Sequence, residues 1–337
     1  MQAITTILLL ALNTICSSSE ELQFFNYITI KIYRGDEPIT LLLQETVNTE
    51  PEVTEVIIEN EPIRVLKAGS FYNLTKLKYI HIQRSELEIL ESFSFQNLPS
   101  LRTIDLSFNR VKEVPANVFA NLTVTKITLK GNRIETFQDL AFYNLTYLRT
   151  LDLSSNNMLE MPMEMFYLTK NLRFLDLSYN RLNQVPKVRE RMPYSYFDEA
   201  FYNIDEFEPS RIDLSFNNFT YITMDIFRML TCLGELKLNY NNIRRIDERA
   251  FDDLRCLKSL DLEGNDLQEI SDRLLKVFAM AETLNLANNP WTNNFACKYE
   301  MWCQTHGKIN TMDVECNYSR SVVDLDASII KNSTFMV

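Results

Sequence analysis

The chain has 337 residues and a formal net charge of −11, with 34 Lys and Arg against 45 Asp and Glu. This balance argues against a nucleic-acid-binding protein and against a basic membrane-surface anchor, because both need clustered Lys and Arg. The length exceeds that of most single globular cores, but a solenoid escapes this limit since each coil packs only on its neighbours.

Residues 1–18 have the pattern of a cleaved secretory signal peptide. An apolar stretch from Ile4 to Leu12 precedes small residues near Thr14, Cys16 and Ser18, as a signal peptidase site requires. The basic n-region is missing, and a buried N-terminal strand is the alternative. No second apolar run of membrane length follows, so the sequence predicts a secreted, extracellular protein with no membrane span in this chain.

Residues 19–52 are predicted to form an N-terminal cap. The segments QFFNYITIKIY and ITLLLQETVN are rich in β-branched and aromatic residues, and the turn-forming residues 34–38 separate them. We expect these two strands to pair as a β-hairpin that covers the exposed apolar end of the coil that follows.

Residues 53–288 repeat one string, which reads LRFLDLSYNRL from Leu172, LRTIDLSFNRV from Leu101 and LKSLDLEGNDL from Leu257. The pattern L-x-x-L-x-L-x-x-N-x-L is typical of leucine-rich repeats, and internal periodicity outweighs other sequence signals. The steps between coils are 24 residues long, with one of 23 and one of 37, which gives about ten coils. The predicted fold class is α/β: a leucine-rich repeat solenoid, or horseshoe, with a parallel sheet on its concave side.

Two residue types recur once per coil. The asparagines are expected inside, where a buried Asn can satisfy backbone groups as the chain leaves the strand. The first two coils have Glu61 and Ser85 at this place and should be less regular. The phenylalanines are expected to fill the convex half of the core. The asparagines are Asn109, Asn132, Asn156, Asn180, Asn217, Asn241, Asn265 and Asn289, and the phenylalanines are Phe71, Phe95, Phe119, Phe142, Phe166, Phe201, Phe227 and Phe251.

The long step contains an insertion at residues 187–199, KVRERMPYSYFDE. A long loop on a regular scaffold often serves binding, so Tyr194 and Tyr196 are candidate partner contacts. A tolerated surface insertion is the alternative.

Residues 289–337 are predicted to form a C-terminal flanking cap and tail. The segment NPWTNNFACKYEMWCQTHGKI resembles the cap of extracellular leucine-rich repeat proteins, in which an N-P-W turn leads into a helix and cysteines tie the segment down. That cap usually has four cysteines, whereas three are present here, namely Cys297, Cys303 and Cys316.

Five of the six cysteines remain after removal of the signal peptide, an odd number for an oxidising compartment. Cys232 and Cys256 occupy the same place in adjacent coils and are one candidate disulfide. Cys297 and Cys316 are the preferred pair in the cap because their disulfide closes the longer loop. Cys303 is then left over, either to form a disulfide-linked oligomer or to lie buried in the cap helix.

Six N-x-S/T triplets are candidate glycosylation sites, and three of them recur at the same place in their coils, where the side chain should point to solvent. Repeat drift is the alternative explanation. The six residues are Asn73, Asn121, Asn144, Asn218, Asn317 and Asn332.

The sequence has no nucleotide-binding loop, metal-ligand spacing or nucleophile motif, and its two histidines, His81 and His306, belong to different elements. We therefore predict a non-catalytic protein without a cofactor or a metal site.

Candidate partner contacts lie in the hollow of the horseshoe. Its middle row contains several aspartates, which the ordinary L-D-L-S spelling of the repeat also explains. Aromatic residues cluster beside the asparagines with basic residues nearby, and Tyr and Arg are typical interface anchors. The proposed contacts are Phe108, Asp176, Tyr179, Arg211, Phe216, Lys237 and Tyr240.

The repeats over about residues 53–320, the signal peptide, the absence of a cysteine-rich N-terminal flank and the odd cysteine near the cap resemble secreted extracellular leucine-rich repeat proteins. They are similar in particular to the insect, mosquito-like leucine-rich immune proteins of the coil-less type. This resemblance implies a soluble recognition or scaffold protein that binds complement-like factors. The chain lacks the C-terminal coiled coil of longer members, so their dimer chemistry is not carried over.

We therefore expect a secreted protein-binding module in extracellular recognition or innate immunity, with an extracellular protein as ligand and no nucleic acid. The alternative is a truncated ectodomain of a leucine-rich repeat cell-surface receptor or adhesion protein. An inhibitor that clamps an enzyme in its hollow is a third, weaker interpretation.

Overall fold

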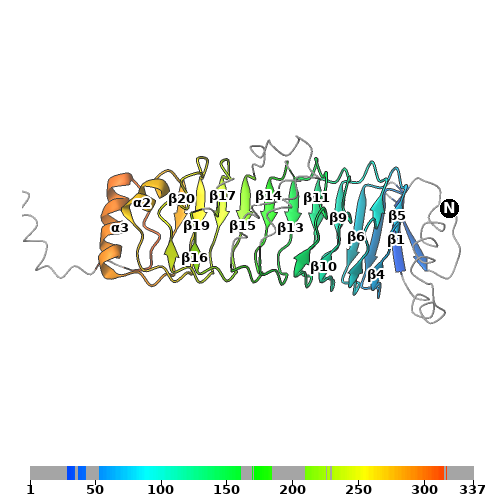
Figure 1. Ribbon diagram of the computed structural model, residues 1–337, viewed down its shortest axis with the longest axis horizontal. Coiled ribbons are helices and arrows are strands. Elements are labelled where there is room, and N and C mark those ends of the chain that lie inside the picture. The colour runs from blue at the N-terminus through cyan, green and yellow to red at the C-terminus, as the bar shows by residue number, and fades with distance from the viewer. Residues whose placement is uncertain are drawn as a thin grey trace, which may run out of the picture.

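The computed structural model describes residues 29–34, 37–42, 53–160, 169, 171–183, 209–224, 226–227, 230–314 and 316, with side chains from residue 53 onward. These residues form one elongated solenoid whose strands stand side by side along the long axis (Figure 1). The predicted signal peptide at 1–18 and the insertion at 187–199 lie outside the described residues.

A 12-stranded sheet runs the length of the described solenoid. Its first two strands form the N-terminal hairpin, and each later strand pairs in parallel with the strand of the next coil, so that Leu151 lies beside Leu175 and Leu175 beside Ile212. The strands are, in spatial order, β2 (Glu37–Leu42), β1 (Thr29–Arg34), β3 (Glu55–Glu59), β6 (Tyr79–Gln83), β9 (Thr103–Asp105), β11 (Lys126–Thr128), β13 (Thr150–Asp152), β14 (Phe174–Asp176), β15 (Arg211–Asp213), β17 (Glu235–Lys237), β19 (Ser259–Asp261) and β20 (Thr283–Asn285). The predicted parallel sheet of a leucine-rich repeat is confirmed.

The N-terminal hairpin is also present as predicted. Strand β1 is antiparallel to β2, with Ile32 opposite Ile39, and antiparallel to β3, with Ile32 opposite Val56. The hairpin thus extends the sheet by two strands and covers the backbone edge of the first coil, which would otherwise be free to pair with another chain.

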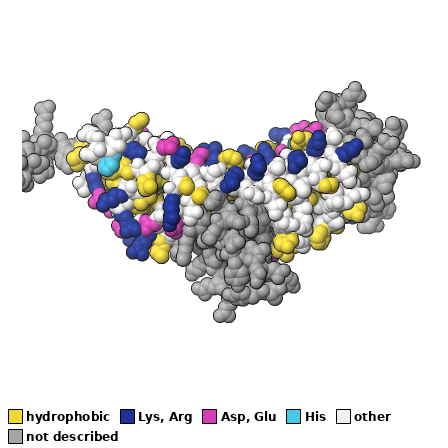
Figure 2. All heavy atoms as spheres, turned by 90° about the horizontal axis from the view of Figure 1, so that it is seen from above, with side chains coloured by type: hydrophobic (Ala, Val, Ile, Leu, Met, Phe, Trp, Pro, Cys, Tyr) yellow, Lys and Arg dark blue, Asp and Glu magenta, His cyan; other side chains and the backbone are white. Residues whose placement is uncertain are grey.

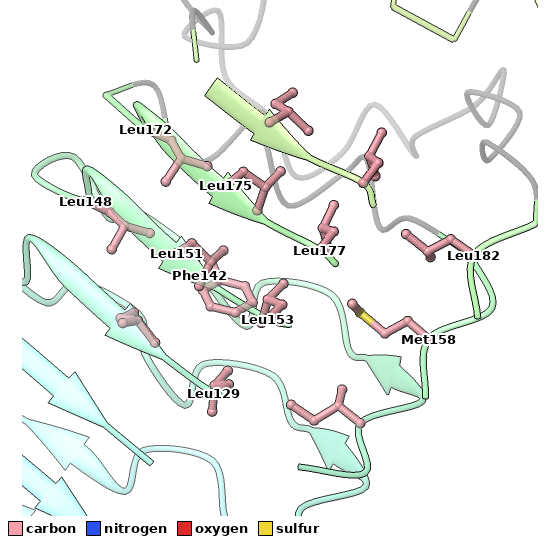
Figure 3. Packing of buried hydrophobic residues seen from close by; sticks show 14 of the residues in the cluster. Leu129, Phe142, Leu148, Leu151, Leu153, Met158, Leu172, Leu175, Leu177 and Leu182 are labelled. Atoms are coloured by element: carbon pink, nitrogen blue, oxygen red, sulfur yellow. The ribbon is translucent and has the colours of Figure 1, made fainter. Parts of the chain in front are cut away.

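The leucines of each coil point into one continuous core. In β14, Leu175 is buried between the more exposed Phe174 and Asp176, as the alternation of a strand requires. Leu172, Leu177 and Leu182 of the same coil are fully buried. Figure 3 shows these leucines stacked on their equivalents in the preceding coil. Each fully buried leucine contributes about 1.5–3 kcal/mol by leaving water.

The repeated asparagines form a hydrogen-bonded ladder, which we call the asparagine ladder. Asn217 Oδ1 accepts a hydrogen bond from the amide of Leu182 at 3.0 Å, and its Nδ2 donates to the carbonyls of Leu177 and Leu214 at 3.0 and 3.1 Å. The Leu177 carbonyl also accepts from Asn180 at 3.1 Å. Each such carbonyl is therefore bonded once by its own coil and once by the next.

Both ends of the asparagine ladder differ from its middle. At the start, Ser85 replaces the asparagine, and its hydroxyl donates to the Gln83 carbonyl at 2.8 Å and lies 3.4 Å from that of Ile58. At the other end, the indole nitrogen of Trp291 donates to the Leu286 carbonyl at 2.8 Å, in the place of the next asparagine. The less regular first coils that we predicted thus keep only a weaker version of this bonding.

The phenylalanines form a buried column on the side of the core away from the sheet. The ring centroids of Phe71 and Phe95 are 5.5 Å apart, and those of Phe95 and Phe119 are 5.7 Å apart. Adjacent strands of a sheet are only about 4.8 Å apart. The coils are therefore spaced more widely at the phenylalanines than at the strands, which bends the solenoid toward the sheet and gives the arc in Figure 2.

Short strands and one short helix line the outer side of the coils. The column of phenylalanines continues from Phe251 to Phe278 of α2, whose ring centroid is 5.3 Å away. Phe166 and Phe201 lie outside the described residues. The outer elements are β4 (Val65–Leu66), β5 (Phe71–Tyr72), β7 (Ile89–Leu90), β8 (Phe95–Gln96), β10 (Glu113–Val114), β12 (Thr136–Phe137), β16 (Tyr221–Ile222), β18 (Arg245–Ile246) and α2 (Asp272–Phe278).

Helix α3 (Asn293–His306) closes the C-terminal end. It begins at Thr292, whose side chain accepts a hydrogen bond from the Phe295 amide, and ends at Gly307, which adopts the left-handed φ of 62° that favours glycine at a helix terminus. Phe295 and Tyr299 on its inner face are buried against the last coil. No helix in the described part of the chain is long and apolar enough to cross a membrane.

Of the two predicted disulfides, the one in the cap is present and the one in the coils is not. Cys297 and Cys316 form a disulfide, with Cα atoms 4.5 Å apart. The predicted Cys232–Cys256 disulfide is wrong, because Cys256 is an exposed free thiol. Equivalent positions in adjacent coils point in the same direction, whereas a disulfide needs the two Cβ atoms to point toward each other. Cys303 is buried within α3, so the buried alternative describes its position.

Candidate functional site

The sheet presents a row of side chains to the hollow, one from the middle of each coil. Asp152 is in register with Asp176, and Asp176 with Asp213. Lys237 follows on β17, and Asp261 follows on β19. We call Asp152, Asp176, Asp213 and Asp261 the acidic row.

Local hydrogen bonds explain why these aspartates recur. Asp176 Oδ1 accepts from the amide of Ser178 at 2.9 Å and from its hydroxyl at 2.6 Å. Asp152 and Asp213 make the same two bonds with Ser154 and Ser215. These hydrogen bonds fix the backbone at the end of each strand. The L-D-L-S sequence therefore has a structural role that is independent of any role of the carboxylates in binding.

The carboxylates of the acidic row differ in how they are neutralised. Asp213 Oδ2 lies 3.8 Å from Arg211 Nη2 and 3.6 Å from Lys237 Nζ, so these two predicted contact residues pair within the chain. Among the described residues, Asp152 and Asp176 have no Lys or Arg nitrogen within the 4.0 Å of an ion pair. In the part of the chain that the structure describes, these two adjacent carboxylates are thus not ion-paired.

Burial affects the ionisation of the acidic row. The pKa of Asp176 is raised, first because burial disfavours the charged form and also because Asp152 and Asp213 are negative, although the bonds from Ser178 oppose this. The pKa of Asp261 is raised mainly by burial as well. These carboxylates are therefore held in an environment that favours a nearby positive charge.

The residue before each ladder asparagine has a left-handed backbone. Its φ is 57° at Phe108 and 54° at Tyr179, Phe216 and Tyr240. A side chain costs about 1–2 kcal/mol in this conformation, which glycine adopts freely. Large aromatic residues at these positions are therefore not the choice that favours stability, and such a feature points to a function.

Three of these aromatic residues form what we call the aromatic stack: Tyr179, Phe216 and Tyr240. The centroids of Tyr179 and Phe216 are 4.2 Å apart with ring planes inclined by 7°, and those of Phe216 and Tyr240 are 4.7 Å apart. Tyr179 is 54% exposed and Tyr240 41% exposed. The structure thus brings together three of the predicted contact residues as a rigid, solvent-facing surface beside the acidic row.

Hydrogen bonds fix the far end of the aromatic stack. The Tyr240 hydroxyl donates to Glu263 Oε1 at 2.8 Å, and Asn288 Nδ2 donates to the same oxygen at 2.8 Å. These bonds, the one from Tyr240 foremost, lower the pKa of Glu263, and the bond to Glu263 raises the pKa of Tyr240. A Cβ on Gly264 would lie 2.6 Å from the Tyr240 ring, so only glycine fits there. Glu263, Gly264 and Asn288 were not among the predicted contacts, although the glycine before an asparagine in LEGN is a signal in the sequence.

Phe108 does not belong to the aromatic stack, contrary to the predicted cluster. Gly131 and Ser155 occupy the equivalent positions in the two coils between Phe108 and Tyr179, and neither has a ring to continue the stack. Phe108 instead lies against Gly131, and the guanidinium carbon of Arg84 lies 5.0 Å from the centroid of its ring. This cation–π pair had no sequence signal, because Arg84 and Phe108 are 24 residues apart in unlike strings.

The remaining predicted sites are partly within the described residues. Tyr194 and Tyr196 lie outside them, as do Asn317 and Asn332. Asn73, Asn121, Asn144 and Asn218 are exposed, as their candidate role requires. Asn144 Nδ2 donates to Asn121 Oδ1 at 2.8 Å, so these two equivalent positions lie side by side.

A second concave region has a different character. A hollow of about 1140 Å³ lies near the C-terminal coils, lined among others by Tyr221, Arg245 and Leu274. Its lining contains both basic and acidic residues, and none of the predicted contacts belongs to it. No group of three or more His, Cys, Asp or Glu that could hold a metal ion occurs in the described residues.

The ladder, the column and the parallel sheet define a solenoid protein built from leucine-rich coils. A model described as "BspA type Leucine rich repeat region (6 copies)" matches residues 49–186, and one described as "Leucine rich repeat" matches residues 210–267. The chain belongs to the leucine-rich repeat family. No curated protein matches it.

Several solved structures share the fold. A chain of the Drosophila Toll–Spatzle complex is 24% identical with a TM-score of 0.51, over 70% of this chain and 34% of that one. A chain of the mouse RP105/MD-1 complex is 19% identical with a TM-score of 0.57, over 80% and 44%. A chain of the octameric complex of Latrophilin 3, Unc5D and FLRT2 is 20% identical with a TM-score of 0.53, over 82% and 89%. This protein therefore spans less than half the length of the first two.

Proposed function

We propose that this protein is a secreted, non-catalytic binding module that recognises an extracellular protein through the aromatic stack and the adjoining acidic row, in extracellular recognition such as innate immunity. The observation that carries the proposal is the aromatic stack itself. Three large rings are stacked at backbone positions that favour glycine, with Tyr179 and Tyr240 exposed and Phe216 half-buried between them. Rigid aromatic anchors of this kind carry much of the energy of protein interfaces.

The similar structures support a protein as the ligand. These structures are a Toll–Spatzle complex, an RP105/MD-1 complex, and a complex of Latrophilin 3, Unc5D and FLRT2. These proteins share only the fold with this chain, so the nature of its ligand rests on the site described above. A parallel solenoid offers many exposed side chains on one rigid frame, which suits the recognition of a large surface.

The test is affinity capture from extracellular fluid of the source organism, followed by mass spectrometry. Tyr179, Phe216 and Tyr240 are changed to Ala together in one variant. The matched control changes Tyr72 of β5 and Tyr143 and Tyr147 of the turns after β12, which are also exposed. We expect the first variant to lose a protein that the wild type and the control both capture. Equal capture by all three would remove the aromatic stack as the binding surface.

Secretion and glycosylation are tested separately. We expect a eukaryotic cell that expresses the full sequence to release the protein into the medium without residues 1–18, and glycosidase treatment to lower its apparent mass. Retention of the intact N-terminus inside the cell would contradict the proposal.

A second proposal is that the chain is part of a receptor or adhesion protein. It is favoured by the comparison with Toll and RP105, whose chains are more than twice as long as the region matched. An in-frame apolar run of about 20 residues downstream of Val337 in the transcript would support this proposal over the first.

A further inference from the structure

We propose that the open face of the Tyr179 ring, together with Asp152 and Asp176, receives an arginine side chain from the protein partner. This inference rests on the proposed function, because it names the chemistry of the partner at the same surface. The partner is then an extracellular protein with an exposed arginine at the centre of its interface.

The two faces of the Tyr179 ring have different surroundings. Phe216 covers one face, with 4.2 Å between ring centroids. On the other side, the equivalent position of the preceding coil is Ser155, whose φ of 57° matches the 54° of Tyr179 but whose side chain has no ring. Within the described residues, no ring or guanidinium covers this face. As far as the described residues go, the stack therefore begins with an uncovered aromatic face.

The chain itself shows what fits such a face. Arg84 and Phe108 occupy the same left-handed position in two adjacent coils, with φ values of 49° and 57°. The guanidinium of Arg84 lies over the Phe108 ring at 5.0 Å, and its Nη1 is held by Glu59 Oε1 at 3.1 Å. A carboxylate on the hollow side thus fixes an arginine on an aromatic face. Beside Tyr179 the ring is present, and Ser155 stands where the arginine would be. The carboxylates there are Asp152 and Asp176 of the middle row, two residues before the position of Glu59, which Lys130 occupies in the coil before Ser155.

The charge around the open face complements a cation. Asp152 is in the coil of Ser155, and Asp176 is in the coil of Tyr179. Each uses Oδ1 to accept from the following serine, and no bond to its Oδ2 occurs among the described residues. Arg211 and Lys237 lie 3.8 and 3.6 Å from Asp213 Oδ2 and are engaged with that carboxylate. A partner arginine would supply a counter-charge to these two carboxylates.

Arginine fits this place better than lysine. Its planar guanidinium stacks on an aromatic ring and can donate to two carboxylates at once, whereas an ammonium is a compact, strongly hydrated charge. Ion pairing and stacking together justify an expected loss of about tenfold in affinity when either element is removed.

The first experiment uses acetyl-Gly-Arg-Gly-amide as the probe and the full-length protein with labelled tyrosine rings for NMR. We expect the Tyr179 ring signal to shift on titration, while that of Tyr240 at the far end stays in place. The matched peptide with citrulline has the same shape without charge and should bind about tenfold more weakly. Equal shifts with citrulline or lysine in place of arginine would overturn the inference.

The second experiment places an arginine of the chain itself against the open face of the Tyr179 ring. In Ser155→Arg, the introduced arginine should stack on Tyr179 as Arg84 does on Phe108, and the peptide should no longer shift the Tyr179 signal. Thr136→Arg adds the same charge at an exposed position of β12 and should leave peptide binding unchanged. Asp152→Asn with Asp176→Asn should weaken binding about tenfold, and Asp139→Asn with Glu160→Gln is the charge-matched control. If Ser155→Arg binds the peptide as the wild type does, the inference is wrong.

The two proposals can fail separately. If the peptide does not shift the Tyr179 signal but the triple aromatic variant still loses its captured partner, the proposed arginine site is wrong, and the aromatic stack remains the binding surface. If the peptide binds as expected but capture does not depend on the aromatic stack, the proposed function is wrong, and the arginine site remains a property of the surface.

Discussion

Removal of one asparagine from the middle of the asparagine ladder should loosen two coils. In Asn241→Ala, the amide of Phe219 loses the Oδ1 that accepts its hydrogen bond at 3.2 Å. The carbonyls of Leu214 and Leu238 each lose a bond of 3.0 Å but keep a second one, from Asn217 and Asn265 respectively. The substitution therefore orphans one buried donor and leaves two acceptors half-satisfied.

The magnitude follows from these losses. An orphaned buried amide costs about 1–3 kcal/mol, and each further lost bond about 1 kcal/mol, which gives about 4 kcal/mol in all. Because each coil packs only on its neighbours, the loss should be local. The neighbouring Asn242 has an exposed side chain, and Asn242→Ala should change the free energy of unfolding by less than about 0.5 kcal/mol.

Urea denaturation measures the difference between these two variants, and amide hydrogen exchange locates it. We expect faster exchange at Phe219 and in the adjoining coils, with unchanged protection around Ile80 and Ile104. If Asn241→Ala costs no more than Asn242→Ala, the asparagine ladder does not stabilise the coils in the way argued here.

Three further predictions concern the core, the acidic row and the thiols. Phe119→Ala should lower the free energy of unfolding by about 3–5 kcal/mol, against little change for the exposed Tyr72→Ala, as measured in urea. The pKa of Asp176 is raised in the folded state, so its charge opposes folding at neutral pH and this effect disappears as the pH falls through its folded pKa. Asp176→Asn keeps the acceptor for Ser178 and should raise stability at neutral pH but not below that pKa; equal stability at both would contradict the burial argument. Iodoacetamide should label the exposed Cys256 rapidly and Cys303 slowly, because Cys303 is buried and burial raises the pKa of its thiol; mass spectrometry of the native protein would refute this if both thiols reacted together.

The coils could be predicted because each repeats the same physical requirement. Leucines that point inward and an asparagine where the chain leaves the strand must recur once per coil. Copies of the string around Leu172 recur at this interval. The cap disulfide could also be anticipated, since Cys297 at the start of α3 and Cys316 beyond its end enclose one helix.

Other features depend on side-chain direction, which the spacing of residues does not give. Cys232 and Cys256 have the right separation for neighbours, but Cys256 is an exposed free thiol, and the spacing alone does not give the direction of the two side chains. Phe108 shares its position with Tyr179, yet what lies beside it is decided by Gly131 and Ser155 in the coils between. The aspartates looked like composition alone, and only the partners of each carboxylate distinguish the neutralised Asp213 from its neighbours.

The asparagine ladder makes every coil an acceptor for the one that follows. The asparagine of a coil donates one hydrogen bond to a leucine carbonyl of the same coil. The second hydrogen bond to this carbonyl comes from the asparagine of the next coil, so any further coil of the same design can supply it. Addition or loss of a whole 24-residue unit therefore leaves the bonding rule intact, which makes the length of such a protein free to vary by duplication. At the last coil the cap takes the place of a further coil. Trp291 donates its indole hydrogen to the Leu286 carbonyl, and the side chains of Thr311 and Asp313 accept from the amides of Leu286 and Asn288, so the cap occupies the bonding sites that another strand would use.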